Sequence, residues 1–174
     1  SDPQGYLRLT PLTGSRRNNA SVALSQNGKQ LTNVYTKPGR DSVIYAQLLK
    51  DGRFLLRPVQ SDNSLISAPA DRDEAIHVTD KPVQASKWRI LEAGRNEYYL
   101  AAKAHPGHYA AIDGDKKRYF LSASSPRQAQ KFDFVELDQN ASAEKAPATY
   151  QQADKRTNYG NDLWKSLVFA ELSL

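Results

Sequence analysis

The chain has 174 residues, a formal net charge of +5, and neither cysteine nor methionine. Disulfides, thiolate chemistry and cysteine-bound zinc are therefore excluded. Lys and Arg are spread along the chain instead of forming one basic patch, which argues against a nucleic-acid partner, and no apolar run approaches the roughly 18 residues of a membrane span.

The first predicted element is a short apolar strand, Gly5 to Pro11 (GYLRLTP). A similar strand, Gly52 to Pro58 (GRFLLRP), follows at an offset of 47 residues, and Asn96 to Ala102 (NEYYLAA) follows that one at an offset of 44. The longer first offset indicates a three-residue insertion in the first copy, in the loop around residues 14–19. This pattern predicts that the chain is built from internal repeats.

Three more short runs follow in each repeat, and they recur at a constant offset of 44 residues. The aligned positions include three prolines and, near the end of each repeat, three large apolar residues: Pro38, Pro82 and Pro126, then Ile44, Trp88 and Phe132. Gly, Asn, Asp and Pro separate the runs, and apolar residues alternate within them, as in Trp88 and Ile90. Such runs are typical of strands, so we predict four strands in each of three repeats, with Ile44, Trp88 and Phe132 buried at equivalent positions about a threefold axis.

This arrangement resembles the β-trefoil superfamily over residues 5–137. Ricin-type lectins of that superfamily carry Gln-x-Trp near the end of each repeat, where this chain has Gln130-Lys-Phe132, Ser86-Lys-Trp88 and Ser42-Val-Ile44. The spacing of proline and aromatic residue is also similar to that of mycocypins, the cysteine-free fungal protease inhibitors. The resemblance implies an all-β fold, a β-trefoil of three four-stranded repeats, with residues 1–137 as its domain and a C-terminal extension behind it.

Behind the repeats, residues 138–149 (DQNASAEKAPAT) are small and polar and predict a linker. Residues 150–174 are amphiphilic. Asn161 is placed to cap a short helix with Leu163, Trp164 and Leu167 on one face, but the apolar run that begins at Leu167 is equally compatible with a strand. Exposed apolar surface of this size favours association, so we expect this extension to pack on the barrel or on a partner.

The third repeat departs most from the other two in its polar residues. One predicted strand pair carries His108, Tyr109, Asp113, Asp115 and Lys117. An aromatic ring beside carboxylates suits a sugar, whose apolar face stacks on the ring while its hydroxyl groups find acceptors. The alternative is that Tyr109 belongs to the barrel core and the aspartates form turns.

The pair His105 and His108 has a spacing that a metal could use. A single His-x-x-His pair on a turn is typical of an ordinary surface loop, so we expect no metal site. The sequence also lacks a Gly-x-Ser-x-Gly elbow and a phosphate-binding glycine-rich loop. Its carboxylates are scattered, and no two of them are recognisable as a pair for general acid–base catalysis. We therefore expect a protein that is not an enzyme and needs no cofactor.

These features favour a recognition module that binds a glycan or a protein surface through its loops. Two alternatives stay open: a protease inhibitor that presents Arg16 or Arg17 on the inserted loop, and a targeting domain of a larger toxin or adhesin. A chain that begins at Ser1 suggests a mature product. We expect it to be secreted or held in the cell envelope, in the periplasm or at the cell surface, with a larger parent protein or a lipid anchor upstream of Ser1 as further hypotheses.

Overall fold

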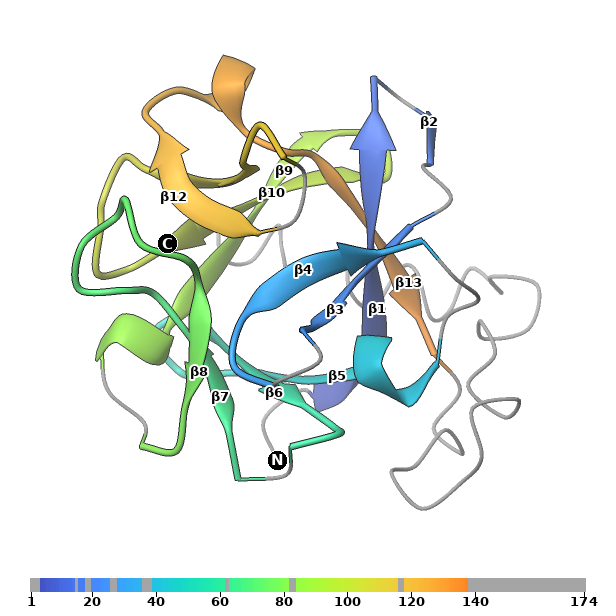
Figure 1. Ribbon diagram of the computed structural model, residues 1–174, viewed down its shortest axis with the longest axis vertical. Helices are drawn as coiled ribbons and strands as arrows, with labels where there is room; N and C mark the ends of the chain where they lie inside the picture. Colours follow the sequence, from blue (N-terminus) through green and yellow to red (C-terminus); the bar gives the residue numbers. More distant parts are fainter. Residues whose placement is uncertain are drawn as a thin grey trace.

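The three repeats form the β-trefoil that their sequences predict (Figure 1). The computed structural model describes residues 4–14, 16–17, 20–25, 28–35, 39–61, 63–81, 84–115 and 118–137. Six strands, the first and the fourth of each repeat, pair antiparallel in a closed ring. In the order of the ring they are β1 (Gln4–Thr13), β5 (Ile44–Leu48), β6 (Phe54–Pro58), β9 (Trp88–Gly94), β10 (Glu97–Ala102) and β13 (Phe132–Glu136).

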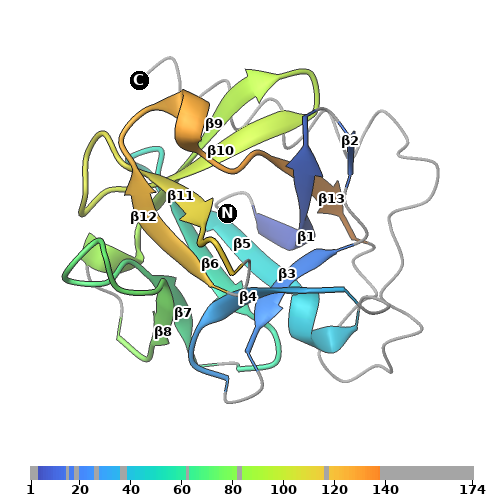
Figure 2. The same ribbon diagram turned by 45° about the horizontal axis from the view of Figure 1, so that its top comes forward.

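The second and third strands of each repeat form a hairpin outside this ring (Figure 2). The hairpins are β3 (Ser21–Leu24) with β4 (Leu31–Val34), β7 (Leu65–Ser67) with β8 (His77–Thr79), and β11 (Tyr109–Ile112) with β12 (Tyr119–Ala123). The backbone N–H of Leu31 donates to the carbonyl of Ile76, and the N–H of Ile76 donates to the carbonyl of Tyr119. All three repeats therefore meet through their hairpins.

Short elements complete each repeat. One turn of 3-10 helix precedes every fourth strand: η1 (Arg40–Ser42), η2 (Gln84–Ser86) and η3 (Pro126–Gln128). The insertion of the first repeat forms β2 (Arg16–Arg17), which pairs with the end of β1. Gly14 turns the chain between them with a φ of 62°, a conformation that glycine adopts without steric cost.

The strand register repeats with threefold symmetry. The first residue of each fourth strand lies opposite equivalent residues of its two neighbours: Ile44 opposes Leu7 and Pro58, Trp88 opposes Phe54 and Ala102, and Phe132 opposes Tyr98 and Pro11. Ile44, Trp88 and Phe132 are 3%, 0% and 1% exposed, which confirms the predicted core positions. The indole of Trp88 also donates from Nε1 to the carbonyl of Ile66 at 2.8 Å.

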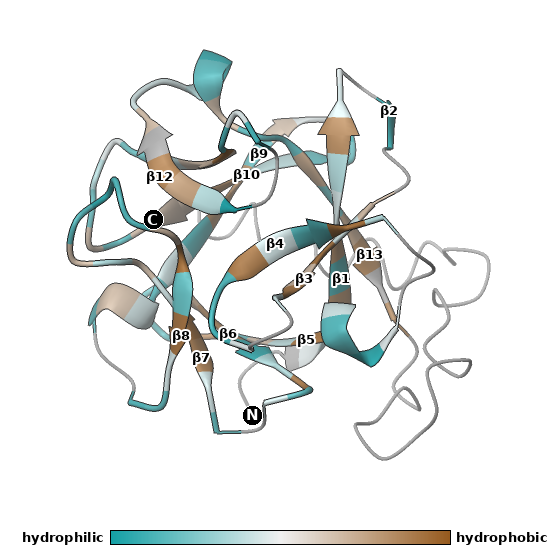
Figure 3. Ribbon diagram, in the orientation of Figure 1, coloured by the Kyte–Doolittle hydropathy of each residue, from teal (hydrophilic) through white to brown (hydrophobic). Residues whose placement is uncertain are grey.

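Apolar and polar residues alternate along the barrel strands (Figure 3), and their burial alternates too, which separates an interior set of side chains from an outward set. On β6, for example, Phe54 and Leu56 are buried, whereas Leu55 and Arg57 are half-buried. The interior contains a tyrosine from the third repeat, Tyr98, and its burial, with smaller effects of nearby carboxylates, raises its pKa to about 12. A tyrosine hydroxyl in the core therefore stays neutral at any physiological pH.

Residues 138–174, with the predicted linker and extension, lie outside the described residues, so these two domain boundaries remain predictions. Within the part that is described, no helix has the length and apolar character that crossing a bilayer requires.

Candidate functional site

Outward side chains of the barrel form three faces that occupy equivalent positions in the trefoil. At the centre of each is one cross-strand pair: Tyr45 with Arg57 on the β5–β6 face, Arg89 with Ala101 on the β9–β10 face, and Asp133 with Thr10 on the β13–β1 face. One backbone hydrogen bond recurs beside each pair, donated by Val59, Lys103 and Leu12 respectively. The backbone thus repeats, and any difference between the faces comes from their side chains.

The β5–β6 face is filled by apolar residues. Val43 and Val59 are 1% and 5% exposed, and they pack in a small cluster with Val135 and Leu137. The rings of Tyr6 and Tyr45 lie beside this cluster with their centroids 5.2 Å apart.

The β13–β1 face is closed by an ion pair. Arg17, on the inserted strand β2, donates from Nε to a carboxylate oxygen of Asp133 at 2.6 Å, and its terminal Nη2 contacts the same oxygen. Arg8 lies on the same face opposite Val135, and its pKa is lowered, first by burial and then by the positive charge of Arg17. The insertion therefore covers this face with its own side chain.

The β9–β10 face is hollow. A cavity of about 300 Å³ lies over the Arg89–Ala101 pair, and the connection after β10 and the start of β11 form its rim. Its floor is Ala101, whose small side chain leaves space that Arg57 and Thr10 occupy on the other two faces. Tyr109 forms one wall, and its ring packs on Tyr99 with the centroids 5.9 Å apart.

Three cationic side chains line this hollow: Arg53, which precedes β6, Arg89 on β9, and Lys103, which follows β10. None of the nine described residues that line it is acidic. The hollow is therefore a recess with an aromatic wall and converging hydrogen-bond donors, which is the usual composition of a small-molecule site.

One carboxylate adjoins the hollow without lining it. The Oδ2 atom of Asp51 lies 3.7 Å from the ammonium groups of both Lys87 and Lys103. Burial acts to raise the pKa of Asp51, but the backbone N–H of Arg53 and the charges of Lys87, Lys103 and Arg53 outweigh it, so the pKa lies below its usual value. Asp51 therefore stays ionised and holds Lys103 at the rim.

The predicted binding segment of the third repeat is divided by the fold. Tyr109 lines the hollow, whereas the neighbouring His108 accepts a hydrogen bond at its Nε2 from Arg72, at 2.7 Å. Asp113 and Asp115 lie beyond the other end of β11, in the turn toward β12, where Asp113 accepts from the backbone N–H of Arg118. Lys117 lies outside the described residues.

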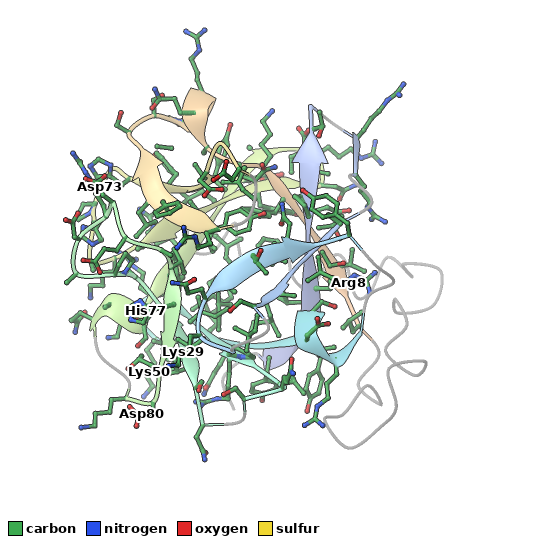
Figure 4. The ribbon with its side chains drawn as sticks, viewed as in Figure 1. Arg8, Lys29, Lys50, Asp73, His77 and Asp80 are labelled. Carbon is green, nitrogen blue, oxygen red and sulfur yellow. The ribbon has the colours of Figure 1, made fainter. Side chains whose placement is uncertain are left out.

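A second and larger recess, of about 860 Å³, lies between the hairpins (Figure 4). Its lining includes charges of both signs, from Lys29, Asp73, Glu74 and Arg118. Opposite charges of similar number give this groove no preference for one class of ligand. Within the described residues, no group of three or more His, Cys, Asp or Glu side chains is arranged to hold a metal ion.

The residues predicted to bind a ligand did not include Arg53, Arg89 or Lys103. The repeat itself contained the signal: at the offset of 44, Arg89 aligns with Tyr45 and Asp133, three unlike residues at one outward position. Outward positions at which the three repeats carry unlike residues therefore point to this face.

No protein-family model matches the chain, and a search of curated proteins finds no match. Solved structures do match. A ricin B-like lectin of Macrolepiota procera, in complex with lactose, aligns with a TM-score of 0.59 and 13% identity over 74% of this chain and 93% of its own. The chain shares the β-trefoil fold with this protein.

Two longer proteins contain a similar unit. A mosquitocidal holotoxin aligns with a TM-score of 0.66 and 7% identity over 75% of this chain and 16% of its own. An endo-β-galactosidase of Clostridium perfringens that releases GlcNAcα1-4Gal aligns with a TM-score of 0.61 and 8% identity over 76% of this chain and 32% of its own. One fold thus occurs in a lectin, a toxin and an enzyme, and at such identities function has to be argued from the site.

Proposed function

We propose that this chain is a non-catalytic recognition module that binds a glycan in the β9–β10 hollow. The observation that supports this proposal is the hollow itself, which combines Tyr109 with the donors of Arg53, Arg89 and Lys103. A tyrosine ring can stack on the apolar face of a pyranose while cationic donors bind its oxygen atoms. The similarity in fold to a lectin crystallised with lactose is consistent with this use.

The test is a glycan array probed with the wild-type protein and two variants that act on the hollow in opposite ways. Ala101→Leu fills the floor, and Tyr109→Ala removes the stacking wall. Either change should reduce binding about tenfold or more, since an aromatic contact and the space for the ligand are both lost.

The control is Ala104→Leu, which adds the same atoms to an exposed alanine of the turn after β10 that does not line the hollow. It should bind as the wild type does. All variants should keep the wild-type melting temperature within a few degrees, because an altered fold would also abolish binding. If the array shows no bound glycan, or if the two hollow variants bind like the control, the proposal is wrong.

Action as a protease inhibitor is a second candidate, supported by the inserted loop of the first repeat. Arg16 is exposed on β2, next to Arg17, whose ion pair with Asp133 fixes the loop to the barrel. A residue displayed on a rigidly held loop is suited to enter the active site of a protease. A panel of proteases that cleave after arginine, tested with Arg16→Ala, separates this function from glycan binding.

The cellular setting follows from the proposed ligand. We propose that the module acts in secreted form or at the cell envelope, where glycans are accessible to it. A role as the targeting domain of a larger toxin or adhesin is compatible with the occurrence of a similar unit in the longer holotoxin. Detection of the protein in the medium, the envelope fraction or the cell interior of its source tests this localisation.

A further inference from the structure

The β9–β10 hollow has a marked excess of positive charge. Arg53, Arg89 and Lys103 line it, and the nine described lining residues include no carboxylate. Asp51 balances part of this charge, since its carboxylate lies 3.7 Å from the ammonium groups of Lys87 and Lys103 and accepts a hydrogen bond from the backbone N–H of Arg53. Cations that converge on a small recess repel one another less when an anion lies between them.

The other two equivalent faces lack this arrangement. Arg57 on the β5–β6 face adjoins the apolar cluster of Val43 and Val59, and Arg17 on the β13–β1 face has Asp133 as its partner. On the β9–β10 face the residue equivalent to Asp133 is Arg89, so the position of an acid is taken by a base. The face therefore lacks at this position the carboxylate that closes the β13–β1 face.

Arg53 has the donors that an anion requires. Its Nε atom is buried and has no hydrogen-bond partner among the described residues. The Nη1 atom makes a long contact of 3.5 Å with the backbone carbonyl of Asp51. A guanidinium group offers two parallel donors that match the oxygen atoms of a carboxylate or a sulfate.

We infer that the glycan bound in this hollow is acidic, with a carboxylate or sulfate group that meets Arg53, Arg89 and Lys103 while a sugar ring stacks on Tyr109. The inference rests on the proposed function. The volume of about 300 Å³ is at the small end of ligand sites, so the hollow selects one or two sugar units that include the charged one. Asp51 acts as a positioning residue that holds Lys103 at the rim.

The experiment uses matched pairs of glycans that differ only in charge. Sialylated glycans are compared with their desialylated parents, sulfated glycans with unsulfated ones, and uronate-containing oligosaccharides with their carboxyl-reduced forms. We expect the acidic member of a pair to bind about tenfold or more tightly, and the affinity to fall as salt is raised, since screening weakens the attraction. The carboxylate and sulfate pairs show separately which anion is preferred.

Variants of Arg53 make the test specific to the hollow. Arg53→Gln should lower the ratio of acidic to neutral affinity about tenfold, because Gln keeps hydrogen-bond donors but not the charge, whereas Arg53→Lys should recover part of the loss because it keeps the charge but not the paired donors. The control Arg40→Gln removes the same charge from exposed η1 in the first repeat and should change affinity less than about twofold.

The outcomes separate this inference from the function on which it rests. If neutral and acidic members bind equally, and binding needs Tyr109 but not Arg53, the protein binds glycans but the hollow does not select for charge, and the inference is wrong. If single-stranded DNA competes as well as the acidic glycans do, the cations attract any polyanion, and the inference is also wrong. If no glycan binds at all, neutral or acidic, both the proposed function and the inference that rests on it are wrong.

Discussion

Trp88 and Arg89 are neighbours on β9, but they belong to two different regions of the molecule. Trp88 points into the barrel, is fully buried, and has an equivalent large apolar residue in each of the other repeats. Arg89 points outward into the hollow, and the residues equivalent to it, Tyr45 and Asp133, differ from it and from each other.

The difference shows where this chain is free to vary. Interior side chains of the three repeats share one close-packed space, so each of them is constrained by the others. Outward side chains pack mainly within their own face, so the three equivalent faces hold an apolar cluster, an ion pair and a hollow. We expect stability to depend on the interior and binding to depend on the hollow.

The largest expected effect sharpens this contrast within a single strand. Trp88→Ala should lower the free energy of unfolding by about 3–5 kcal/mol, because it removes a fully buried indole and leaves a cavity. The adjacent Arg89→Ala should cost less than about 1 kcal/mol. Urea denaturation of the two variants measures both values, and similar losses would contradict the division between interior and outward positions.

The C-terminal extension tests whether packing outside the barrel also contributes. We predict that Trp164 and Phe169 pack against the barrel, so deletion of residues 150–174 should lower the free energy of unfolding by roughly 2–3 kcal/mol, the effect of exposing large apolar side chains. Thermal and urea melts of the truncated chain provide the measurement. If the truncated chain is as stable and soluble as the full chain, the extension does not pack on the barrel, and binding to a partner is favoured instead.

Breaking the ion pair of the β13–β1 face should lower the free energy of unfolding by a smaller amount, and this amount should depend on which of the two partners is replaced. Arg17→Ala leaves the carboxylate of Asp133 in a site that is 4% exposed, so it should cost about 1–2 kcal/mol. Asp133→Asn should cost less, because the side chain of Arg17 is 39% exposed and can find water. A double-mutant cycle measures the coupling, and a larger loss for Asp133→Asn would contradict this account.

The smallest effect concerns Asp51 at the edge of the hollow. Its folded-state pKa is lowered, so its contribution to stability is present above the unfolded pKa of about 3.9 and is lost as pH falls through the folded value. The difference between the wild type and Asp51→Asn should therefore stay under about 1 kcal/mol above pH ~5 and disappear in stronger acid. Melting curves from pH 2 to 7 measure it, and a difference that grows in acid would have the wrong sign.

The sequence by itself determined the trefoil. The offset of 44 residues placed Ile44, Trp88 and Phe132 at equivalent positions, and the structure gives all three the predicted burial and register. The insertion around residues 14–19 was also visible as the offset of 47, and it forms β2. These features could be predicted because a repeated core leaves a repeated pattern of apolar residues in the sequence.

Only the tertiary structure decided which polar residues share a site. The segment from His108 to Asp115 looked like one surface in the sequence, but β11 separates its two ends, and only Tyr109 lines the hollow. Arg53, Arg89 and Lys103 are far apart in the chain and meet because β6, β9 and β10 are adjacent in the barrel. The pairing of β6 with β9 and of β9 with β10 brings these side chains together, and the spacing of residues in the sequence does not reveal which outward side chains become neighbours.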